Sequence, residues 1–313
     1  MKIGLHANQL DHRGNSTVIY DYASALKNYF GYDVHIITSK PKSTHPMDKF
    51  SKFGYSMYEN VSELECLVDK EKIDVLYMTK AGNIDKICPT NCKTAIHCVF
   101  DMREPHGSVY AGVSEWLAQY YKKELWVPHI IDIKKTNSTL HHELGIPKTA
   151  FIVGRLGGYE QFDLPFVHSA IKSALNARQD LYTVFLNTKP FIDHPRAKFI
   201  PFQPELEFKG NFISTCDAMI HGRSDGETFG LAVAEFSSMN KPILTYDAPY
   251  WWYMRSHLHI LGEKAITYKN EEELLSYLLQ IDKEYVRDID WDCYSTRFSP
   301  ANVIERFNTI FIK

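Results

Sequence analysis

The chain has 313 residues, a length that suggests two domains of ordinary size. Apolar residues make up 44% and charged residues 23%, which is typical of a soluble globular protein. The 35 basic and 38 acidic residues give a formal net charge of -3 without any long basic run. The electrostatic pattern of a nucleic-acid binder is therefore absent, and we expect no nucleic-acid partner.

The first residues carry one lysine, a short apolar run and then polar residues, so we expect no signal peptide. No window approaches the roughly 18 consecutive apolar residues of a transmembrane helix. We therefore expect a cytoplasmic protein. Among the six cysteines only Cys88 and Cys92 lie close together, and no second pair completes a zinc site. Buried thiols and no bound metal are the expectation.

Short apolar runs alternate with helical spacing along the first half of the chain. Lys2–His6 predicts a strand, Val18–Tyr29 a helix and Val34–Thr38 a second strand, which together form a βαβ unit. Residues 39–60 give no readable pattern. The elements expected after them are a helix over Val61–Glu71, strands over Asp74–Met78, Thr94–Val99 and Val109–Val113, a helix over Glu115–Lys122 capped by Ser114, and a short strand over Leu125–Val127.

The same alternation begins again after Gly145-Ile-Pro147, where glycine and proline mark a break. The elements expected there are strands over Ala150–Val153, Leu181–Leu186, Lys198–Pro201, Ala218–His221 and Pro242–Thr245, and helices over Leu164–Ala174, Leu231–Met239, Glu271–Leu279 and Ala301–Phe311. Two such series predict an α/β protein with two doubly wound Rossmann-like domains, residues 1–147 and 148–299, facing each other across a cleft. Whether the last helix, residues 300–313, crosses back to the first domain is left open.

The most informative segment runs from Asp217 to Ser238. It predicts a strand that ends at His221, a polar loop with glycines, and a helix that begins near Gly230. In a doubly wound sheet such a loop lies at the carboxyl edge of the strands, where ligands bind. The start of the helix offers unpaired N–H groups and a partial positive charge, which suit a diphosphate. Gly230 would let the backbone approach a ligand closely.

Two glutamates bracket this helix start. Glu227 and Glu235 are eight positions apart, which along a helix is about 12 Å. A nucleotide sugar has hydroxyls at both ends and phosphates between them, so Glu227 can accept hydrogen bonds from the sugar and Glu235 from the ribose. Glu235 also lies among alanine, valine and phenylalanine, where an unpaired carboxylate is costly, and a ribose diol would give it a partner.

The segment from Glu227 to Glu235, Glu-Thr-Phe-Gly-Leu-Ala-Val-Ala-Glu, resembles the Glu-x7-Glu signature of retaining GT-B glycosyltransferases, especially the mannosyltransferase-like branch of glycosyltransferase family 4. Further segments resemble that family in the same order: Thr94–Val99, Ala111–Glu115, Pro128–Asp132 and Val153–Leu156. The resemblance implies a GT-B fold, with residues 1–147 as the acceptor-side domain and residues 148–299 as the domain that binds the nucleotide sugar. It also implies metal-independent transfer of a hexose, with retained anomeric configuration, from a nucleoside-diphosphate sugar to a hydroxyl of a glycan or other acceptor. It favours GDP-mannose as the donor, with UDP-glucose second, and no cofactor.

The resemblance also implies roles for individual residues. His97 matches the family's histidine directed at the transferred sugar, and Arg155 matches its arginine facing the diphosphate. Glu227 matches the glutamate that binds the sugar, and Glu235 the one that binds the ribose. The other donor-binding candidates are Gly14, whose turn Asp11–Thr17 replaces a glycine-rich loop, and the helix-start residues Thr228, Phe229, Gly230 and Leu231.

One departure concerns the charge near the diphosphate. The family usually has a lysine five positions after the arginine, where this chain has Glu160. A carboxylate repels a diphosphate, so Lys189 is the candidate substitute cation and Arg223 a second. The same departure favours an alternative function, a catalytically silent GT-B protein that binds nucleotide sugar or glycan.

Several features bear on different interpretations of the chain. A nicotinamide dehydrogenase would need Gly-x-Gly-x-x-Gly after the first strand, which is missing, and a GT-B epimerase has no support from the glutamate pair. His97 in an apolar strand can also be read as a core residue. The segment Tyr250-Trp-Trp-Tyr253 suits stacking on a sugar or a contact in a homodimer, and the sequence does not separate these two interpretations.

Overall fold

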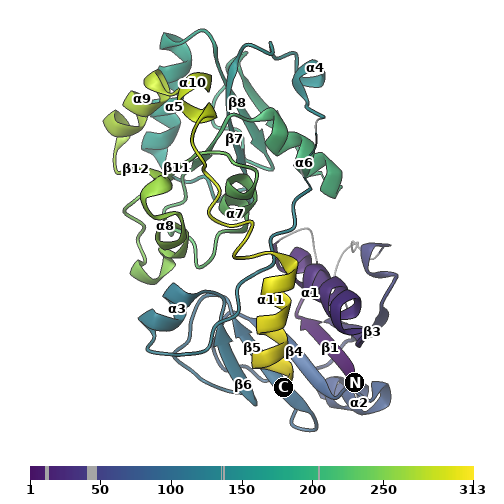
Figure 1. Ribbon diagram of the computed structural model, residues 1–313. Coiled ribbons are helices and arrows are strands. Elements are labelled where there is room, and N and C mark those ends of the chain that lie inside the picture. Colours follow the sequence, from purple (N-terminus) through teal and green to yellow (C-terminus); the bar gives the residue numbers. More distant parts are fainter. Residues whose placement is uncertain (11–13, 41–47, 135, 137, 204) are drawn as a thin grey trace. The chain divides into compact units, whose positions relative to one another are not determined.

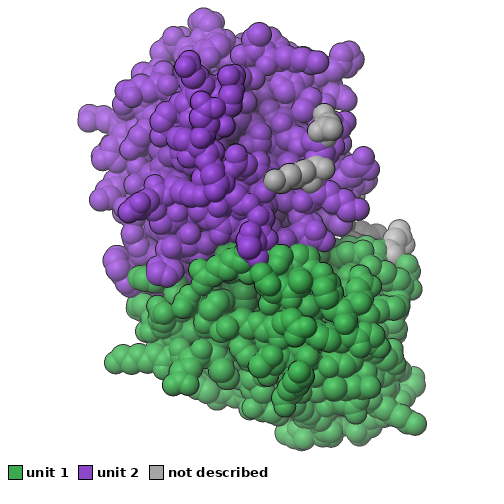
Figure 2. All heavy atoms as spheres, viewed as in Figure 1, with its two compact units in different colours: residues 1–130, 297–313 green, residues 131–296 purple. Residues whose placement is uncertain are grey.

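The computed structural model describes the whole chain except residues 11–13, 41–47, 135, 137 and 204. The chain divides into two compact units, which Figure 2 shows in separate colours. Unit 1 comprises Met1–Ile130 and Arg297–Lys313, and unit 2 comprises Ile131–Thr296. The first unit thus ends at Ile130, whereas the sequence analysis placed the boundary after Pro147.

Unit 1 is built on a six-stranded, wholly parallel sheet in the order β3-β2-β1-β4-β5-β6. The strands are β1 (Lys2–Ala7), β2 (Asp33–Ser39), β3 (Gly54–Tyr58), β4 (Val75–Lys80), β5 (Lys93–Cys98) and β6 (Val109–Gly112), and the helices are α1 (Gly14–Phe30), α2 (Ser62–Glu71), α3 (Glu115–Tyr120) and α11 (Pro300–Phe307). The strand order reverses between β1 and β4, as in a doubly wound domain. Every residue of β4 is buried, which is expected for a central strand covered on both faces.

The C-terminal helix belongs to unit 1 and completes its core. Helix α11 runs on into a π-helical turn, Asn308–Ile312, and lies beside α1 (Figure 1). The ring of Phe307 lies 4.7 Å from that of Tyr22 on α1 and 4.9 Å from that of Tyr77 on β4, centroid to centroid. Phe311 lies 5.5 Å from Tyr77. These rings are fully buried, so the end of the chain is a structural part of the first unit.

Unit 2 repeats the same architecture with the sheet order β12-β11-β10-β7-β8-β9. Its strands are β7 (Phe151–Leu156), β8 (Leu181–Leu186), β9 (Ala197–Ile200), β10 (Ala218–His221), β11 (Ile243–Tyr246) and β12 (Ala265–Tyr268), and its helices are α4 (His141–Leu144), α5 (Pro165–Ala177), α6 (Leu206–Thr215), α7 (Leu231–Ser238), α8 (Ser256–Leu261), α9 (Glu271–Gln280) and α10 (Lys283–Arg287), with 3-10 turns at Trp252–Met254 and Gly262–Lys264. All pairings are parallel, and the order reverses between β7 and β10. Two doubly wound α/β units are therefore confirmed.

Local sequence signals explain where the elements begin. The side chain of Ser114 accepts a hydrogen bond from the amide of Leu117 and caps α3, as predicted. Helix α5 begins with Pro165 at its first turn, where a missing N–H costs nothing. The strand predicted over Leu125–Val127 was wrong, because only an isolated bridge between Gly112 and Trp126 forms there.

The cysteines agree with the expectation only in part. All six are free thiols; Cys98 and Cys216 are buried, but Cys66 is exposed. None of the helices in the described part of the chain combines the length and apolar character that a membrane span requires.

Candidate functional site

The predicted site residues of unit 2 gather at the carboxyl ends of β7 and β10, the two strands between which the order reverses. Register pairing of Met219 with Gly154 brings the end of β10 beside Arg155 on β7. The two loops that follow are tied together, because Asp163 accepts hydrogen bonds from the amide of Ser224 (2.8 Å) and from its hydroxyl (2.7 Å). In open α/β sheets this position is where ligands bind.

The loop that carries Glu227 has a fixed backbone. The amide of Glu227 donates to the carbonyl of Met254 (2.7 Å), and the amide of Ser256 donates to the carbonyl of Glu227 (3.0 Å). Gly226 has φ +81°, and a Cβ there would lie 2.3 Å from the Met254 carbonyl oxygen. Gly230, with φ +85°, is the residue before α7. Both positions therefore require glycine.

The carboxylate of Glu227 is held by two nitrogen donors. Arg223 Nη1 lies 3.1 Å from Oε2, and His221 Nε2 lies 3.4 Å from Oε1. Burial alone would raise the pKa of Glu227, but the hydrogen bond from His221 and the positive charge of Arg223 outweigh burial and lower the pKa to about 2. Glu227 is therefore an ionised acceptor at neutral pH.

A chain of hydrogen bonds lies behind this glutamate. The hydroxyl of Thr245 lies 3.0 Å from His221 Nδ1 and 3.2 Å from His257 Nε2. An ionised carboxylate can only accept, so Nε2 of His221 must carry a proton. The Thr245 hydroxyl thus links the rings of His221 and His257 behind the glutamate. Burial lowers the pKa of His257 to about 3, which keeps that ring neutral.

The sequence analysis missed the role of His257, because α8 was not predicted and no local pattern links it to β11. Its nearness to His221, with ring centroids 4.8 Å apart, arises only from the tertiary fold. His221 itself carried only the weak signal of a histidine at a strand end.

Arg155 is a buried cation whose hydrogen bonds go to neutral groups. Nη1 donates to the Thr188 hydroxyl (2.6 Å) and the Asn187 carbonyl (3.3 Å), and Nη2 donates to the Gly158 carbonyl (3.0 Å). Burial lowers the pKa of Arg155 to about 10, while the nearby charge of Glu227 acts in the opposite direction. The guanidinium stays charged at neutral pH and is an electrostatic source for a nearby anion.

Glu235 has a protein partner that the sequence did not reveal. Its carboxylate on α7 is buried and pairs with the ammonium of Lys209 on α6. The expected need for a ribose to satisfy this carboxylate is therefore removed. Lys209 was missed because the sequence analysis did not predict α6.

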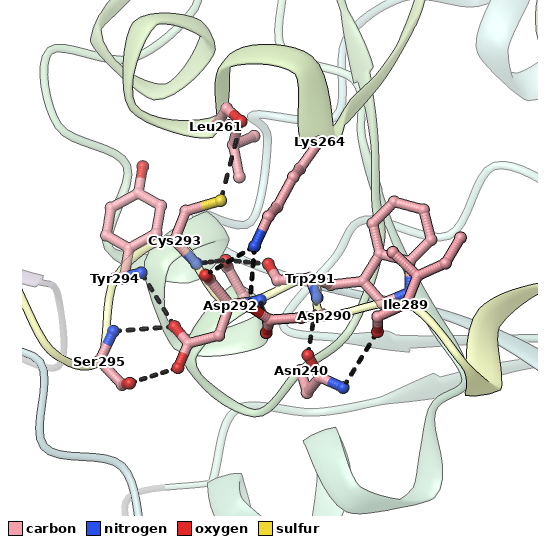
Figure 3. A network of polar contacts seen from close by, with 11 residues as sticks. Asn240, Leu261, Lys264, Ile289, Asp290, Trp291, Asp292, Cys293, Tyr294 and Ser295 are labelled. Atoms are coloured by element: carbon pink, nitrogen blue, oxygen red, sulfur yellow. Dashed lines mark hydrogen bonds and ion pairs between the residues drawn. The ribbon is translucent and has the colours of Figure 1, made fainter.

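Residues 289–295 form hydrogen bonds with the C-terminal end of helix α7 and with the turn that follows it (Figure 3). Trp291 donates its backbone amide to the side chain of Asn240 just after the helix (2.7 Å). The hydroxyl of Ser237 donates to the Trp291 carbonyl (2.8 Å) and accepts from the amide of Cys293 (3.0 Å). At the helix start, Thr228 and Phe229 are buried, while Leu231 is half-buried.

The role expected for His97 is wrong. Its ring, in unit 1, is fully buried. Nδ1 lies 2.6 Å from the Tyr77 hydroxyl and Nε2 lies 2.8 Å from the Val127 carbonyl, so both ring nitrogens are engaged by the protein. Burial also lowers the pKa of His97 to about 4. A neutral histidine with both nitrogens bonded is a core residue and cannot hold a sugar.

Two further candidates are Lys189, which directly follows the Arg155 partner Thr188, and Gly14. Lys189 pairs with Glu160 at 3.8 Å, and both side chains are largely exposed. Glu160, the carboxylate that departs from the family pattern, thus forms an ion pair with Lys189. Lys189 is the residue proposed to supply the positive charge of the missing family lysine. Gly14 is the exposed first residue of α1, and the preceding part of its predicted turn, residues 11–13, lies outside the described residues.

Comparisons with known proteins give matches in structure. No protein-family model matches the chain, and no curated protein matches its sequence. HepE from Anabaena, solved with UDP-glucose, is 13% identical and has a TM-score of 0.75 over 99% of this chain and 98% of that chain. A glycosyltransferase from Rickettsia africae is 13% identical, with a TM-score of 0.70 over 99% and 97%.

A third neighbour of the same architecture has a different description. A putative UDP-N-acetylglucosamine 2-epimerase from Listeria monocytogenes is 11% identical, with a TM-score of 0.62 over 98% of this chain and 94% of that chain. At such low identity these likenesses establish the fold alone. The chain has the GT-B fold, with two doubly wound, Rossmann-like domains.

Proposed function

We propose that this protein transfers a hexose from a nucleoside-diphosphate sugar to an acceptor hydroxyl, with retained configuration and without a metal ion. The observation that carries the proposal is the ionised Glu227, held by Arg223 and His221, within electrostatic reach of the buried cation Arg155 at the point where the strand order of unit 2 reverses. The structure from Rickettsia africae, which has the same fold and is described as a glycosyltransferase, supports it, as does HepE, which was solved with UDP-glucose.

Glu227 is suited to bind the transferred sugar. Sugar hydroxyls are hydrogen-bond donors, and a carboxylate with a pKa of about 2 accepts from them throughout the physiological pH range. Arg223 and His221 hold the carboxylate in one orientation and keep it charged. A sugar bound in this way has its anomeric carbon in a fixed position, which is the main requirement for transfer.

The diphosphate is the group whose negative charge grows as the sugar leaves. Helix α7 begins at Leu231 after a left-handed glycine, so its first amides are available to phosphate oxygens. Arg155 adds a fixed positive charge, and Arg223, which is also mostly buried, adds a second. Fixed charges and dipoles of this kind stabilise a leaving group without reorganisation during the reaction.

For the donor we propose testing UDP-glucose first and GDP-mannose second. The family resemblance favoured GDP-mannose, but the structural neighbour HepE was solved with UDP-glucose. We assign Glu235 to the ribose, now with Lys209 as a second hydrogen-bonding group at the same place. The acceptor hydroxyl attacks from the face that the phosphate leaves, and His97 has no part in this step.

A catalytically silent binding protein is the second candidate. Glu160 favours it, because this exposed carboxylate stands where the resembling family has a lysine and it pairs with Lys189 at 3.8 Å. Such a protein would bind a nucleotide sugar without releasing nucleotide. Measuring free nucleotide after incubation with donor therefore separates the two candidates.

The test combines calorimetry with a turnover assay on wild type, Glu227→Ala and Glu235→Ala. We expect Glu235→Ala to weaken binding of UDP and UDP-glucose alike, and Glu227→Ala to impair nucleotide release while UDP still binds. Glu284→Ala, which changes an exposed glutamate on α10, is the matched control. Unchanged affinity and turnover in both site variants would refute the assigned roles.

A further inference from the structure

We infer that the aromatic segment Tyr250–Tyr253 is a platform for the sugar rings of a glycan acceptor, built directly onto the loop that carries Glu227. The inference rests on the proposed function and extends it to the class of acceptor. It also chooses between the two interpretations that the sequence left open for this segment.

The aromatic segment is attached to the Glu227 loop at both of its ends. The amide of Tyr250 donates to the carbonyl of Ser224 (2.8 Å), at one end of the segment. At the other end, the amide of Glu227 donates to the Met254 carbonyl (2.7 Å). Main-chain bonds therefore fix the four aromatic residues between two points of the loop.

The turn at Gly226 brings the two backbones into contact as well. A Cβ on Gly226 would lie 2.7 Å from Cβ of Pro249, the residue that precedes the aromatic segment. The close approach depends on glycine on one side and on a rigid proline on the other. Any movement of the aromatic rings relative to Glu227 is limited by this packing.

The rings of the aromatic segment are exposed and have a defined mutual arrangement. Tyr250 is 75% exposed, Trp252 58% and Trp251 44%, which is unusual for three successive large aromatic residues. The rings of Tyr250 and Trp251 stand perpendicular at 4.7 Å, and Trp251 and Tyr253 are 5.8 Å apart and tilted by 32°. The surface is thus a set of ring faces and edges in fixed orientations.

A cation supports the third ring. The guanidinium of Arg255 lies 4.6 Å from the centre of the Trp252 ring and pairs with Asp247 at 2.5 Å. The indole is held on one side by this contact, which orders it without burying it. An ordered aromatic face that remains exposed costs little entropy when it binds a ligand.

The exposed aromatic side chains match sugar rings in their chemistry and in their size. Sugar rings present C–H groups on their faces and hydroxyls at their edges, and tyrosine and tryptophan offer an apolar face with a polar edge. Three rings of about 150–250 Å² each, roughly half exposed, offer on the order of 300 Å². A standard protein interface needs about 800 Å² from each partner, so the platform alone is too small to hold a stable homodimer together.

The rings suit the acceptor better than the donor. The donor hexose is assigned to Glu227, which is mostly buried, and binding there requires an enclosed site. The exposed rings begin at Tyr250, whose amide is bonded to Ser224, three residues before Glu227. The exposed aromatic surface therefore starts close to the Glu227 site in the fold. An acceptor that extends over several sugar residues matches a surface of this kind.

The experiment uses the full chain and an array of immobilised mono- to tetrasaccharides of glucose, galactose, mannose and N-acetylglucosamine. We expect the wild type to bind at least one of these glycans, and Trp251→Ala and Trp252→Ala to lower its affinity about tenfold each, as loss of one stacking contact would. The matched control is Tyr29→Ala, at an exposed aromatic residue of α1 that is 51% exposed. Its glycan affinity should equal that of the wild type.

A parallel arm measures donor affinity and the state of association. Calorimetry with UDP-glucose should give the same affinity for the two tryptophan variants and the wild type, and the molar mass in solution should not change. The inference is overturned if no glycan binds to the wild type, if the variants bind glycan as the wild type does, if they lose donor affinity instead, or if they dissociate a dimer. Failure of the proposed function is distinguishable, because then the wild type releases no nucleotide from the donor, whatever its affinity for glycans.

Discussion

Replacing Glu227 by glutamine should remove most of a pH-dependent contribution to stability. The pKa of Glu227 is about 2 in the folded protein, against 4.5 for a free glutamate side chain. At about 1.36 kcal/mol for each pH unit, this difference corresponds to about 3 kcal/mol. Because the folded-state pKa is depressed, this contribution is fully present above pH 4.5 and is lost as the pH falls toward 2.

The measurement is the free energy of unfolding in urea, followed by tryptophan fluorescence at pH 7 and pH 3. We expect Glu227→Gln to be destabilised relative to the wild type at pH 7, and the difference to shrink at pH 3 by about 2 kcal/mol. Glu284→Gln, at an exposed position, should show no difference at either pH. A Glu227→Gln variant that is destabilised equally at both pH values would refute the electrostatic account of this site.

Three further changes test other parts of the structure. Arg155→Lys keeps the charge but loses the planar fork, so calorimetry should show UDP affinity reduced about tenfold, and an unchanged affinity would remove Arg155 from the donor site. Lys209→Met leaves the carboxylate of Glu235 buried without its partner, so the free energy of unfolding in urea should fall by about 1–3 kcal/mol. The double variant Lys209→Met with Glu235→Gln should recover part of that loss, and the absence of recovery would contradict the pairing. His97→Phe leaves the hydroxyl of Tyr77 and the Val127 carbonyl buried without a partner, so the free energy of unfolding should fall by about 2–3 kcal/mol while donor affinity stays unchanged. A loss of donor affinity in a fully folded variant would restore His97 to the site.

The fold was predictable because the buried strands are short apolar runs and the covering helices show regular spacing. Ala218–His221 was predicted with its observed bounds, since four buried residues are followed directly by a glycine turn. The edge strands β3 and β12 were missed for the opposite reason. Most of their residues are exposed or only partly buried, so neither a continuous apolar run nor a clean alternation marks them.

The candidate site was predictable only where its residues are close in sequence. The loop from His221 to Gly230 contains Glu227, Arg223 and the glycines, and the local pattern of strand, loop and helix brings them together. The partners Lys209 and His257 lie on helices that the pattern did not reveal, and tertiary packing alone brings them there.

The error at His97 has a physical reason. A histidine at the end of a parallel strand can face a ligand or turn into the core, and the sequence around it is the same in both cases. The choice is made by Tyr77 on the neighbouring strand and by the carbonyl of Val127, whose positions depend on the assembled sheet.

The return of α11 to the first unit has a consequence for synthesis on the ribosome. The first 130 residues emerge without the two phenylalanines that later cover Tyr22 and Tyr77. The 166 residues of the second unit, Ile131 to Thr296, must be translated before those rings arrive, which at 5–20 residues per second takes roughly 8–33 s. During that interval the nascent first segment of unit 1 exposes an aromatic surface on which chaperones can act, and the unit is completed only after α11 has been translated.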